Sequence, residues 1–346
     1  MGSKREYIIR EKLNPALLLA LLVCFLCCKE QVVSVAEESD TYSYYPYFER
    51  HGGNLRLAKL SRDSDLRITK DLPVMDGATS LYPVYAAFAQ AVYPESVFWV
   101  KDDYVTDAGG MRMTGEHEGN PLYASRTRGA YENIISGKAD IIFVAKPSEK
   151  QAKAARLAGV SLVFTPIIAE AFVFIVNKHN PINSLTEEQV RKIYTGEFTL
   201  WDDLGVGGLG KIRAFQRREG SGSQSAMIDF MGGAKLAEPK EKELILDMMR
   251  DMLEIVADYK NYKNAIGYSF HFYVTGMKSV GGVKLLSIDG VYPSEENMKN
   301  GKYHLKRIFF AVTRSDSNKS TLRLLEWIKG PQGKELIRNT GYIPVE

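Results

Sequence analysis

The sequence predicts an α/β fold with mostly parallel sheets, and three observations support this prediction. The chain has 346 residues, which is enough for two domains with well-buried cores. Strand-like and helix-like segments alternate from about residue 70 to the C-terminus. Residues 160–178 contain two apolar, β-rich runs, which are typical of strands in a sheet covered on both faces.

The individual elements follow from hydrophobic spacing and capping residues. A helix is predicted from Tyr82, after a turn of small residues at Asp76–Ser80. Another is capped by Ser184 or Thr186 and ends at Gly196. The remaining predicted elements are helices at about 129–137, 223–231 and 320–340, and strands at 139–145, 211–216, 265–274, 284–288 and 307–314.

Composition excludes several classes of function. The net charge is +3 without runs of like charge, so nucleic acid is not an expected partner. All three cysteines lie in the first 28 residues, which excludes a disulfide framework or a cysteine-based metal site in the rest of the chain. The five histidines are scattered, without the spacing of a helix-borne zinc pair. No metal and no cofactor are expected.

The N-terminal segment, residues 1–28, has the pattern of an export signal. Basic residues precede an apolar run from Ala16 to Cys28, shorter than the roughly 20 residues of a membrane-spanning helix. The final cysteine resembles that of a bacterial lipoprotein signal, although Phe25 and Leu26 stand where such signals carry small residues. We expect lipidation of Cys28, with an uncleaved short anchor as the alternative. Both interpretations place the following domain at the extracellular face of the cell membrane or in the periplasm.

Two motifs suggest chemistry that their context does not support. Residues 205–211, GVGGLGK, match glycine patterns that bind dinucleotides or nucleotide phosphates. Both patterns need a helix after the loop, whereas a strand is predicted here, and Ile212 replaces a magnesium-binding hydroxyl. Ser221 lacks the G-x-S-x-G context of a hydrolase nucleophile. The sequence therefore predicts a flexible loop and no catalytic serine.

Three turns rich in small or hydroxyl-bearing residues each precede a predicted helix: GATS at 77–80, SRTRGA at 125–130 and REGSGSQ at 218–224. A helix N-terminus carries unpaired N–H groups and partial positive charge, so it favours anions. Each turn alone is explained by N-capping, because Ser and Thr are preferred there. Arg217 adds a planar fork for two oxygens, so the set favours an oxyanion site. Its candidate hydroxyl donors are Thr79, Ser80, Thr127, Ser221 and Ser223.

At these turns the chain resembles the PstS-like phosphate-binding proteins of bacterial phosphate ABC importers. The resemblance covers about residues 70–346, and its most specific element is R-x-[DE]-G-S-G-[ST] at 217–223. It implies a two-lobed periplasmic-binding-protein fold of type II, with two crossover strands forming the hinge. Other stretches that carry it are DGATSLYPVYAAFAQAVYP, GAYENIISGKADIIFVAKPS, NPINSLTEEQVRKIYTGEFTLWDDLG, AIGYS and GPQGKELIRNTGYIPV.

The resemblance also implies a division of the chain. Residues 29–69 are expected to be a tether and a loosely packed lead-in. Residues 70–167 together with 305–346 would form one lobe, and residues 168–304 the other. The ligand would lie in the cleft between the two lobes.

The family pattern assigns roles to residues in each of the three turns. Hydroxyl and N–H groups of the first two turns hold the anion with the arginine and small residues of the third. An acid of the third turn orients the arginine. The matching positions are Thr79, Ser80, Thr127, Arg217, Glu219, Ser221, Gly222 and Ser223. Arg126 and Arg128 flank the second-turn hydroxyl, and they either add positive potential or are solvated surface residues.

One position departs from the family pattern. Well-studied phosphate binders carry an Asp there, which accepts the proton of a protonated phosphate and so distinguishes it from sulfate. This chain has Ala145 instead, followed by Lys146. Three interpretations remain open: another carboxylate such as Glu219 or Glu170 accepts the proton, discrimination is relaxed, or the ligand differs.

The expected function is capture of inorganic phosphate or a related tetrahedral oxyanion for the permease subunits of an ABC importer, by a membrane-anchored monomer that is not an enzyme. An anion sensor for a membrane signalling partner is one alternative, which the sequence does not distinguish. A phosphate-ester hydrolase is another. It needs a nucleophile with a base or metals, and the sequence shows no convincing set.

Overall fold

The computed structural model describes residues 57–94, 104–107, 110–113, 121–239, 241–247, 249–258, 262–277 and 281–346. The chain divides into two compact units, Met1–Ser43 and Tyr44–Glu346, and all described residues lie in the second unit. The predicted signal, its lipidation site Cys28 and the expected tether up to residue 56 lie outside the described residues. None of the helices in the described part is both long enough and apolar enough to span a membrane.

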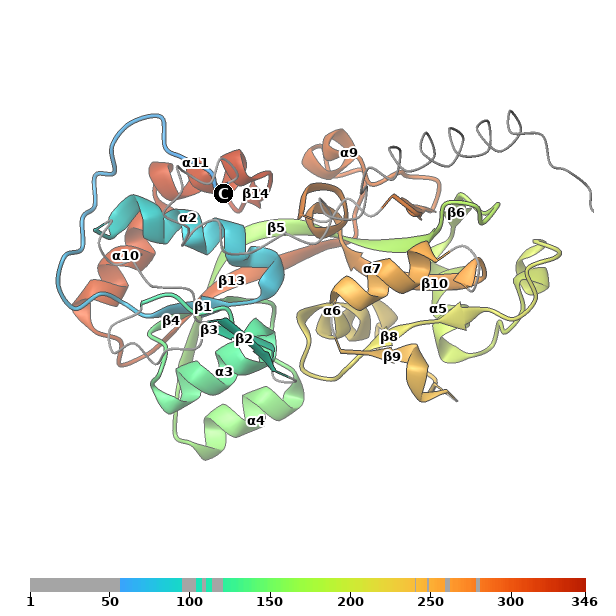
Figure 1. Cartoon of the computed structure of the whole chain (residues 1–346), viewed down its shortest axis with the longest axis horizontal. Helices are drawn as coiled ribbons and strands as arrows, with labels where there is room; N and C mark the ends of the chain where they lie inside the picture. The colour runs from blue at the N-terminus through green and yellow to red at the C-terminus, as the bar shows by residue number, and fades with distance from the viewer. Residues whose placement is uncertain are drawn as a thin grey trace, which may run out of the picture. The chain divides into compact units, whose positions relative to one another are not determined.

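The elements alternate as an α/β fold (Figure 1). The strands are β1 (Met75–Gly77), β2 (Tyr104–Asp107), β3 (Gly110–Met113), β4 (Ile141–Val144), β5 (Leu162–Asn177), β6 (Ser184–Leu185), β7 (Arg213–Ala214), β8 (Gln216–Arg217), β9 (Ile245–Leu246), β10 (Ala265–Phe270), β11 (Val283–Leu285), β12 (Ser287–Ile288), β13 (Lys306–Arg314) and β14 (Ile343–Pro344). The α-helices are α2 (Tyr82–Val92), α3 (Arg126–Ser136), α4 (Glu149–Leu157), α5 (Glu187–Thr195), α6 (Gly222–Met231), α7 (Met249–Ala257), α9 (Glu295–Lys299), α10 (Lys319–Lys329) and α11 (Pro331–Thr340). Short 3₁₀ turns are η1 (Thr79–Leu81), η3 (Trp201–Leu204) and η4 (Lys242–Leu244), and a π-helical turn is η5 (Tyr273–Met277).

The main sheet has the strand order β1-β4-β13-β5-β10-β7, with β11 and β14 also paired to β5. The β1–β4 and β10–β7 pairs are parallel. In contrast, β13 is antiparallel to both β4 and β5, and β10 is antiparallel to β5. The prediction of mostly parallel sheets is therefore wrong. The chain passes along β5 and returns along β13, so this central pair has to be antiparallel.

The long strand β5 connects the two ends of the sheet. It pairs with β13 over Leu162–Ala171 and with β10 over Phe172–Val176. The two apolar runs expected from the sequence are one continuous strand of 16 residues. The interruption near Pro166 is a local register shift opposite Phe309 and Phe310, because proline has no N–H group for the ladder.

Helix boundaries follow the capping signals, with two refinements. Thr186 caps α5 in a capping box, Ser184 belongs to β6, and α5 ends at Gly196 in the left-handed conformation. Helix α3 begins at Arg126, ahead of the expected start near residue 129.

Helices pack on both faces of the sheet. Side chains of α3 pack against one face of β4 and β13, where Ile142, Val144 and Val312 form a small separate cluster. The opposite face contributes Phe143 and Ala311 to the large core, together with residues of α2, α10 and α11. Where β5 pairs with β10, helices α5 and α6 contact the aromatic residues of these strands. Helix α7 also packs on this part of the sheet.

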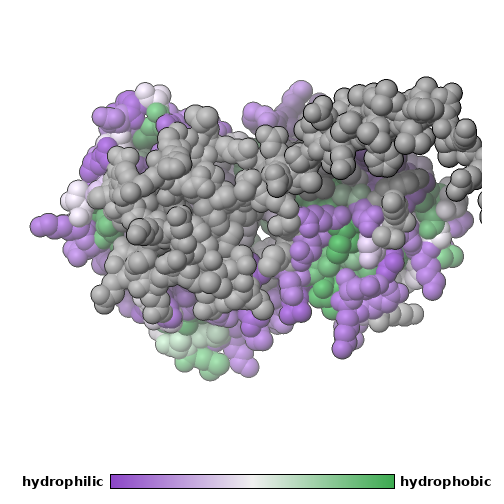
Figure 2. All heavy atoms as spheres, in the orientation of Figure 1, coloured by the Kyte–Doolittle hydropathy of each residue, from purple (hydrophilic) through white to green (hydrophobic). Residues whose placement is uncertain are grey.

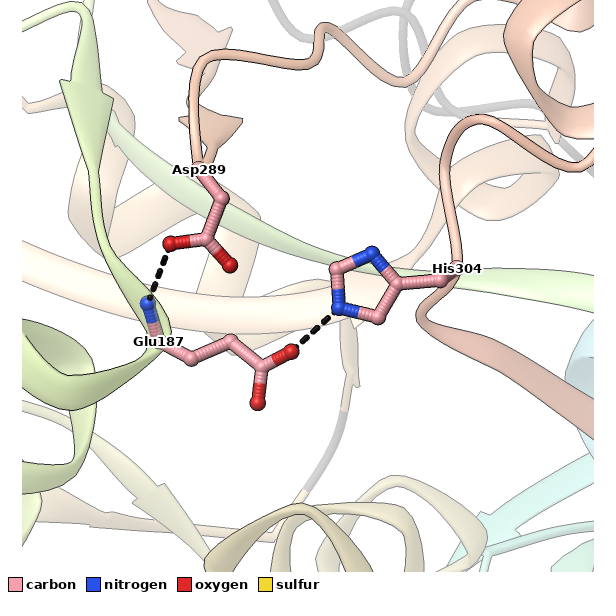
Figure 3. A group of neighbouring side chains, drawn as sticks. All are labelled: Glu187, Asp289 and His304. Atoms are coloured by element: carbon pink, nitrogen blue, oxygen red, sulfur yellow. Dashed lines mark hydrogen bonds and ion pairs between the residues drawn. The ribbon is translucent and has the colours of Figure 1, made fainter.

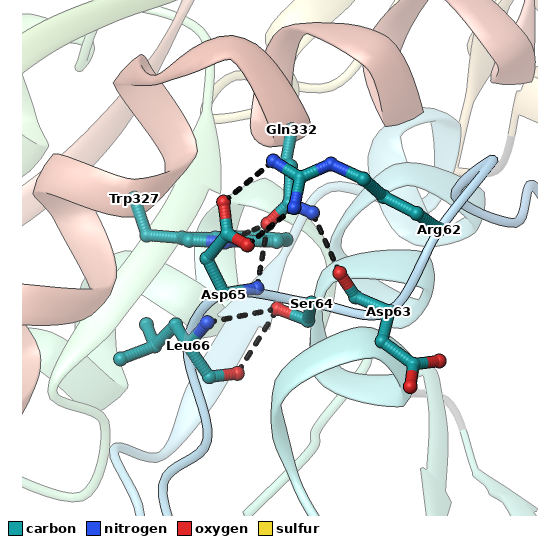
Figure 4. Close-up of polar contacts among 7 residues, drawn as sticks. All are labelled: Arg62, Asp63, Ser64, Asp65, Leu66, Trp327 and Gln332. Carbon is teal, nitrogen blue, oxygen red and sulfur yellow. Dashed lines mark hydrogen bonds and ion pairs between the residues drawn. The ribbon is translucent and has the colours of Figure 1, made fainter.

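The lead-in before β1 is ordered against the C-terminal helices (Figure 4). Arg62 forms a bidentate ion pair with Asp65, at 2.6 and 2.8 Å. The backbone N–H of Asp65 and the indole N–H of Trp327 both donate to Oε1 of Gln332. Leu66 is 7% exposed. The expectation of loose packing is therefore wrong for this part, since Gln332 ties it to α11.

The surface in view is mainly hydrophilic at its edges (Figure 2). Hydrophobic side chains gather below, over the position of α4 in Figure 1. Leu157 at the end of α4 is 78% exposed, and Val163 at the start of β5 is 45% exposed.

Candidate anion-binding site

The third turn joins β8 to the N-terminus of α6. Ser221 is the N-cap, and its hydroxyl accepts a hydrogen bond from the N–H of Gln224 at 3.2 Å. Gly220 has φ = 84°, in the left-handed region where glycine is favoured. Gly222, the first residue of α6, lies close to Ala145, the residue after β4.

Arg217 is the central cation of this turn, and it is 6% exposed. Its backbone N–H faces the hydroxyl of Tyr268 at 2.9 Å and Oε1 of Gln224 at 3.1 Å. In the guanidinium group, Nη2 donates to the carbonyl oxygen of Asp247 at 2.7 Å. The Nε and Nη1 atoms are buried and have no hydrogen-bond partner among the described residues. The N–H groups of these two atoms are therefore available to an acceptor.

The pKa of Arg217 is lowered to about 10, mainly by burial; Tyr268, Tyr273 and Asp251 oppose this effect, and the positive charge of Arg126 adds a small lowering. The group stays protonated at neutral pH. A buried cation with unpaired donors is unfavourable, because its lost hydration is not replaced by protein groups. An oxyanion bound at this point would supply both the charge and the missing acceptors.

A second buried donor lies on the first turn of α6. Ser223 has no exposed surface, and its hydroxyl oxygen has no hydrogen-bond partner among the described residues. The neighbouring Gly222 is closely approached from another element: a methyl group on its Cα would lie 3.2 Å from Oγ1 of Thr127 and 3.5 Å from Cβ of Ala145. The structure therefore brings Gly222, Thr127 and Ala145 together.

The second turn has an unusual backbone. Ser125 has φ = −81° and ψ = 8°, and Arg126 follows with φ = 62°, a left-handed conformation that is rare for a residue with a side chain. Consecutive right- and left-handed residues direct their N–H groups into one concavity that suits an anionic group, and here the carboxylate of Asp76 accepts from the N–H of Ser125. Thr127, the next residue, is 5% exposed.

Asp76 holds this turn in place. Its carboxylate accepts hydrogen bonds from the N–H groups of Gly77 at 2.7 Å and Ser125 at 2.8 Å, and from Nδ2 of Asn133 at 2.7 Å. Burial raises the pKa of Asp76 to about 6, while the hydrogen bonds from Ser125, Asn133 and Gly77 lower it. Sequence reasoning placed Asp76 in the first turn without a role. The sequence feature that could have predicted a role for it is the placement of an acidic residue at the end of a buried strand.

The first turn forms η1. Ser80 is 5% exposed, and its carbonyl oxygen accepts a hydrogen bond from the hydroxyl of Tyr342. Thr79 is partly exposed. No hydrogen bond given for the described residues connects these two residues to the third turn.

Three further residues near the turns are Glu219, Arg128 and Lys146, and only Glu219 lies differently from the expectation. Glu219 is exposed, and the contact that orients the Arg217 guanidinium is the carbonyl oxygen of Asp247. Arg128 lies beside the third turn, because a methyl group on Gly220 would come within 3.9 Å of its Cβ and Cγ. Lys146 is exposed.

One contact between α4 and the third turn could not be predicted from the sequence, which indicates only helix capping at this position. Nε2 of Gln151 donates to the carbonyl oxygen of Gly220 at 3.3 Å. The same side chain forms the capping box of α4 with Ser148. Gln151 therefore links the start of α4 to the turn that carries Arg217.

A separate polar cluster lies at the start of α5 (Figure 3). Glu187, Asp289 and His304 place one possible ligand atom each within 4.8 Å of one another. The carboxylate of Glu187 already pairs with His304 and Arg191, and Asp289 accepts from the N–H of Glu187 at 3.2 Å. Burial raises the pKa of Glu187, but the hydrogen bond from His304 and the charge of Arg191 lower it overall. The polar groups of this cluster thus already interact with other groups of the protein.

The chain belongs to the PBP superfamily, whose domain matches residues 66–331. It is 25% identical over 180 residues to the phosphate-binding protein PstS of Borreliella burgdorferi, covering 51% of this chain and 64% of that protein. It is 29% identical over 172 residues to the PstS of Bacillus subtilis, covering 49% of this chain and 53% of that protein. The matched region thus spans less than two thirds of the length of these two relatives.

Two solved structures share the fold. A Clostridium perfringens substrate-binding protein with bound phosphate gives a TM-score of 0.58 at 24% identity, covering 81% of this chain and 100% of that chain. An ABC-type phosphate transport receptor from Vibrio cholerae gives a TM-score of 0.54 at 21% identity, covering 80% of this chain and 99% of that chain. The expected two-lobed periplasmic-binding-protein fold and the resemblance to PstS are thereby confirmed.

Proposed function

We propose that this chain is an extracytoplasmic solute-binding protein that captures inorganic phosphate, or a related tetrahedral oxyanion, for an ABC importer. The observation that carries the proposal is the set of buried donors in the third turn that have no hydrogen-bond partner among the described residues: Nε and Nη1 of Arg217 and the hydroxyl of Ser223. The names of the PstS relatives, which are phosphate-binding proteins, support the choice of ligand.

The energetics of these donors suit tight binding. A micromolar complex requires about 8 kcal/mol. Hydrogen bonds to a charged group contribute roughly 1.5–3 kcal/mol each, so five to eight fixed donors are enough after the costs of ordering and desolvation. We assign the donor set to Thr79, Ser80, Thr127, Arg217, Ser221, Gly222 and Ser223, with Glu219 near the rim.

We further propose that the chain forms two lobes, residues 70–167 with 305–346 and residues 168–304. The strands β5 and β13 would act as the hinge, because they are the long strands that pass between the two ends of the sheet. Closure around the anion would exclude water and strengthen every hydrogen bond to it. The protein would then deliver the anion to permease subunits as a monomer attached to the membrane through Cys28 or an N-terminal anchor. No chemistry on the ligand is required, and the chain is proposed not to be an enzyme.

Isothermal titration of the domain, freed of carried-over anion, tests the proposal with phosphate and then sulfate at neutral pH. We expect phosphate to bind with micromolar or better affinity, and Arg217→Ala to abolish binding. Turnover of a generic phosphate ester should be absent with or without divalent metal. Absence of phosphate binding by the wild-type domain contradicts the assignment of the ligand, and ester turnover would favour a hydrolase.

A further inference from the structure

A hydrogen bond between Gln151 and Gly220 joins the two proposed lobes. Gln151 is near the start of α4, within residues 70–167, and Gly220 is in the third turn, within residues 168–304. Nε2 of Gln151 donates to the carbonyl oxygen of Gly220 at 3.3 Å. Both residues are buried, and Gln151 is 9% exposed. A buried carbonyl oxygen needs a donor, because its lost hydration is otherwise not replaced. The bond therefore joins groups that both lobes remove from water.

The cap of α4 holds the amide group of Gln151 in place. Its Oε1 accepts from the backbone N–H of Ser148 at 2.8 Å, and the hydroxyl of Ser148 accepts from the backbone N–H of Gln151 at 3.3 Å. These two hydrogen bonds form a capping box. Because Oε1 is fixed in this way, the planar amide presents Nε2 to Gly220. The cap thus orders the side chain, so the bond to Gly220 costs little additional side-chain entropy.

The segment that carries Gln151 is also tied to the helix that carries Thr127. The buried hydroxyl of Tyr131, on α3, donates to the carbonyl oxygen of Ala145 at 2.7 Å. Ala145 follows β4 and leads into the cap of α4. Thr127 lies one helical turn before Tyr131 on the same helix. The second turn and the cap of α4 therefore form one connected support within the first proposed lobe.

Gly220 is the point at which this support reaches the third turn. Its φ of 84° lies in the left-handed region that glycine adopts without steric cost, so its own side of the turn sets few limits on movement. The next residue, Ser221, caps α6, and Gly222 follows as the first residue of that helix. A methyl group on Gly222 would lie 3.2 Å from Oγ1 of Thr127. Holding the carbonyl of Gly220 therefore restricts the turn where it approaches the second turn.

Arg128 also lies beside Gly220, but its charged group is used elsewhere. A methyl group on Gly220 would lie 3.9 Å from Cβ and Cγ of Arg128. Nε of Arg128 donates to Glu132 at 3.2 Å, and the two side chains are 68% and 67% exposed. An exposed pair of this spacing contributes little to stability. Gln151 is therefore the side chain that links α4 to the third turn.

We propose that Gln151 is a positioning residue that holds the third turn against the second and thereby slows release of the bound anion. This inference rests on the proposed function and its two lobes. The anion leaves when the turns separate, and in that arrangement Nε2 of Gln151 and the carbonyl of Gly220 both bind water. The bond between them therefore gives the closed arrangement a modest net advantage. It forms as the lobes close, so its loss raises the dissociation rate and leaves the association rate unchanged.

Exchange of bound radiolabelled phosphate with excess unlabelled phosphate measures the dissociation rate, and the Kd from calorimetry then gives the association rate. Gln151→Met removes the donor without adding charge. Gln151→Glu removes it and keeps an oxygen that accepts from the N–H of Ser148. We expect both variants to raise the dissociation rate about fivefold, and the Met variant to keep the wild-type association rate. Ser148→Ala, the matched control, removes the capping hydroxyl and keeps Nε2 of Gln151. It should lower the melting temperature and leave both rates unchanged.

The outcomes separate this inference from the proposed function. If phosphate fails to bind the wild-type domain, the proposed function fails and this inference fails with it. If phosphate binds but both Gln151 variants release it at the wild-type rate, the function stands and Gln151 does not hold the anion.

Two further results contradict the role of Gln151. Faster release from the Glu variant alone is an effect of its charge, and equally fast release from Ser148→Ala is an effect of helix capping. If the Met variant does not fold, the Glu variant is measured in about 1 M salt, which screens charges beyond roughly 3 Å. Release at the wild-type rate under that condition contradicts the proposal, and release that stays about fivefold faster supports it.

Discussion

Two glycine-rich loops with a basic residue, 205–211 and 217–223, differ in the element that each one enters and in the groups that each one buries. In the first, Gly205, Gly208 and Gly210 have positive φ, are exposed and have open space where a side chain would stand. It leads into the short strand β7, as the sequence context predicted. The second leads into α6 and buries polar atoms of Arg217 and Ser223 that have no hydrogen-bond partner in the part of the chain that the structure describes.

The difference shows why a glycine pattern alone does not make an anion site. Glycines in the 205–211 loop only allow the chain to turn, and its backbone is used locally: Gly210 accepts from the N–H of Trp201 at 3.0 Å. In the 217–223 turn, glycine at position 222 allows Thr127 and Ala145 to approach closely. A loop becomes a candidate site when it removes donors from water and leaves them unpaired.

The largest expected difference between the two loops concerns their basic residues. Arg217→Met should weaken phosphate binding by at least about 100-fold, because it removes two charge-assisted hydrogen bonds. Lys211→Met, in the exposed loop, should leave the affinity unchanged. The melting temperature of ligand-free Arg217→Met should not fall, since an apolar side chain replaces a buried cation with unpaired donors. Calorimetry and thermal melting measure the two quantities. Equal phosphate affinities of Arg217→Met and Lys211→Met would contradict the proposed difference between the two loops.

The second prediction concerns Asp76, which fixes the turn next to Thr127. The pKa of Asp76 is raised in the folded state, to about 6 from 3.8, so the folded state binds its proton more tightly than the unfolded chain. Its stabilising contribution is complete below about pH 4 and is lost as the pH rises through about 6. We expect the free energy of unfolding, wild type minus Asp76→Asn, to fall by about 2–3 kcal/mol across this interval.

Denaturant unfolding of both proteins at several pH values measures this difference. Because both proteins contain Glu170, subtracting one free energy of unfolding from the other cancels the pH dependence that Glu170 contributes. A difference that does not change between pH 4 and 7 would contradict the burial effect on Asp76.

The third prediction compares glycines of the two loops. A methyl group at residue 222 would stand 3.2 Å from Oγ1 of Thr127, so Gly222→Ala should weaken phosphate binding about tenfold by separating the donors. Gly208→Ala has open space but φ = 82°, so it should cost about 1–2 kcal/mol of stability without changing affinity. Reversed effects in calorimetry and melting would show that the 205–211 loop takes part in binding.

The smallest expected effects separate two serines of the same turn. Ser223→Ala removes a buried, unpaired hydroxyl, so it should weaken phosphate binding about tenfold while leaving stability unchanged or raised. Ser221→Ala removes the N-cap of α6 and should cost about 1 kcal/mol of stability. A loss of stability in Ser223→Ala that matches the loss in Ser221→Ala would assign both serines to capping.

Local structure was largely predictable from the sequence. Thr186 and Ser221 cap helices, and Gly196 ends one, because these choices depend on a few neighbouring residues. The strand direction was not predictable, since β13 comes from the C-terminal part of the chain to pair between β4 and β5. The backbone conformation of Arg126 was missed for a similar reason: the distant Asp76 holds the N–H of the preceding residue.

The sequence by itself determined the α/β class, the three turns and the candidate donors, because hydrophobic spacing and capping chemistry are local properties. Only the tertiary structure decided that Gly222, Thr127 and Ala145 meet, that β5 is one strand, and that Nε and Nη1 of Arg217 find no partner among the described residues. It also decided that Glu170 is buried with one carboxyl oxygen that has no partner in the described part of the chain, whereas Glu219 is exposed. Burial and hydrogen bonding depend on residues far apart in the chain, and desolvation acts only once those residues have packed together.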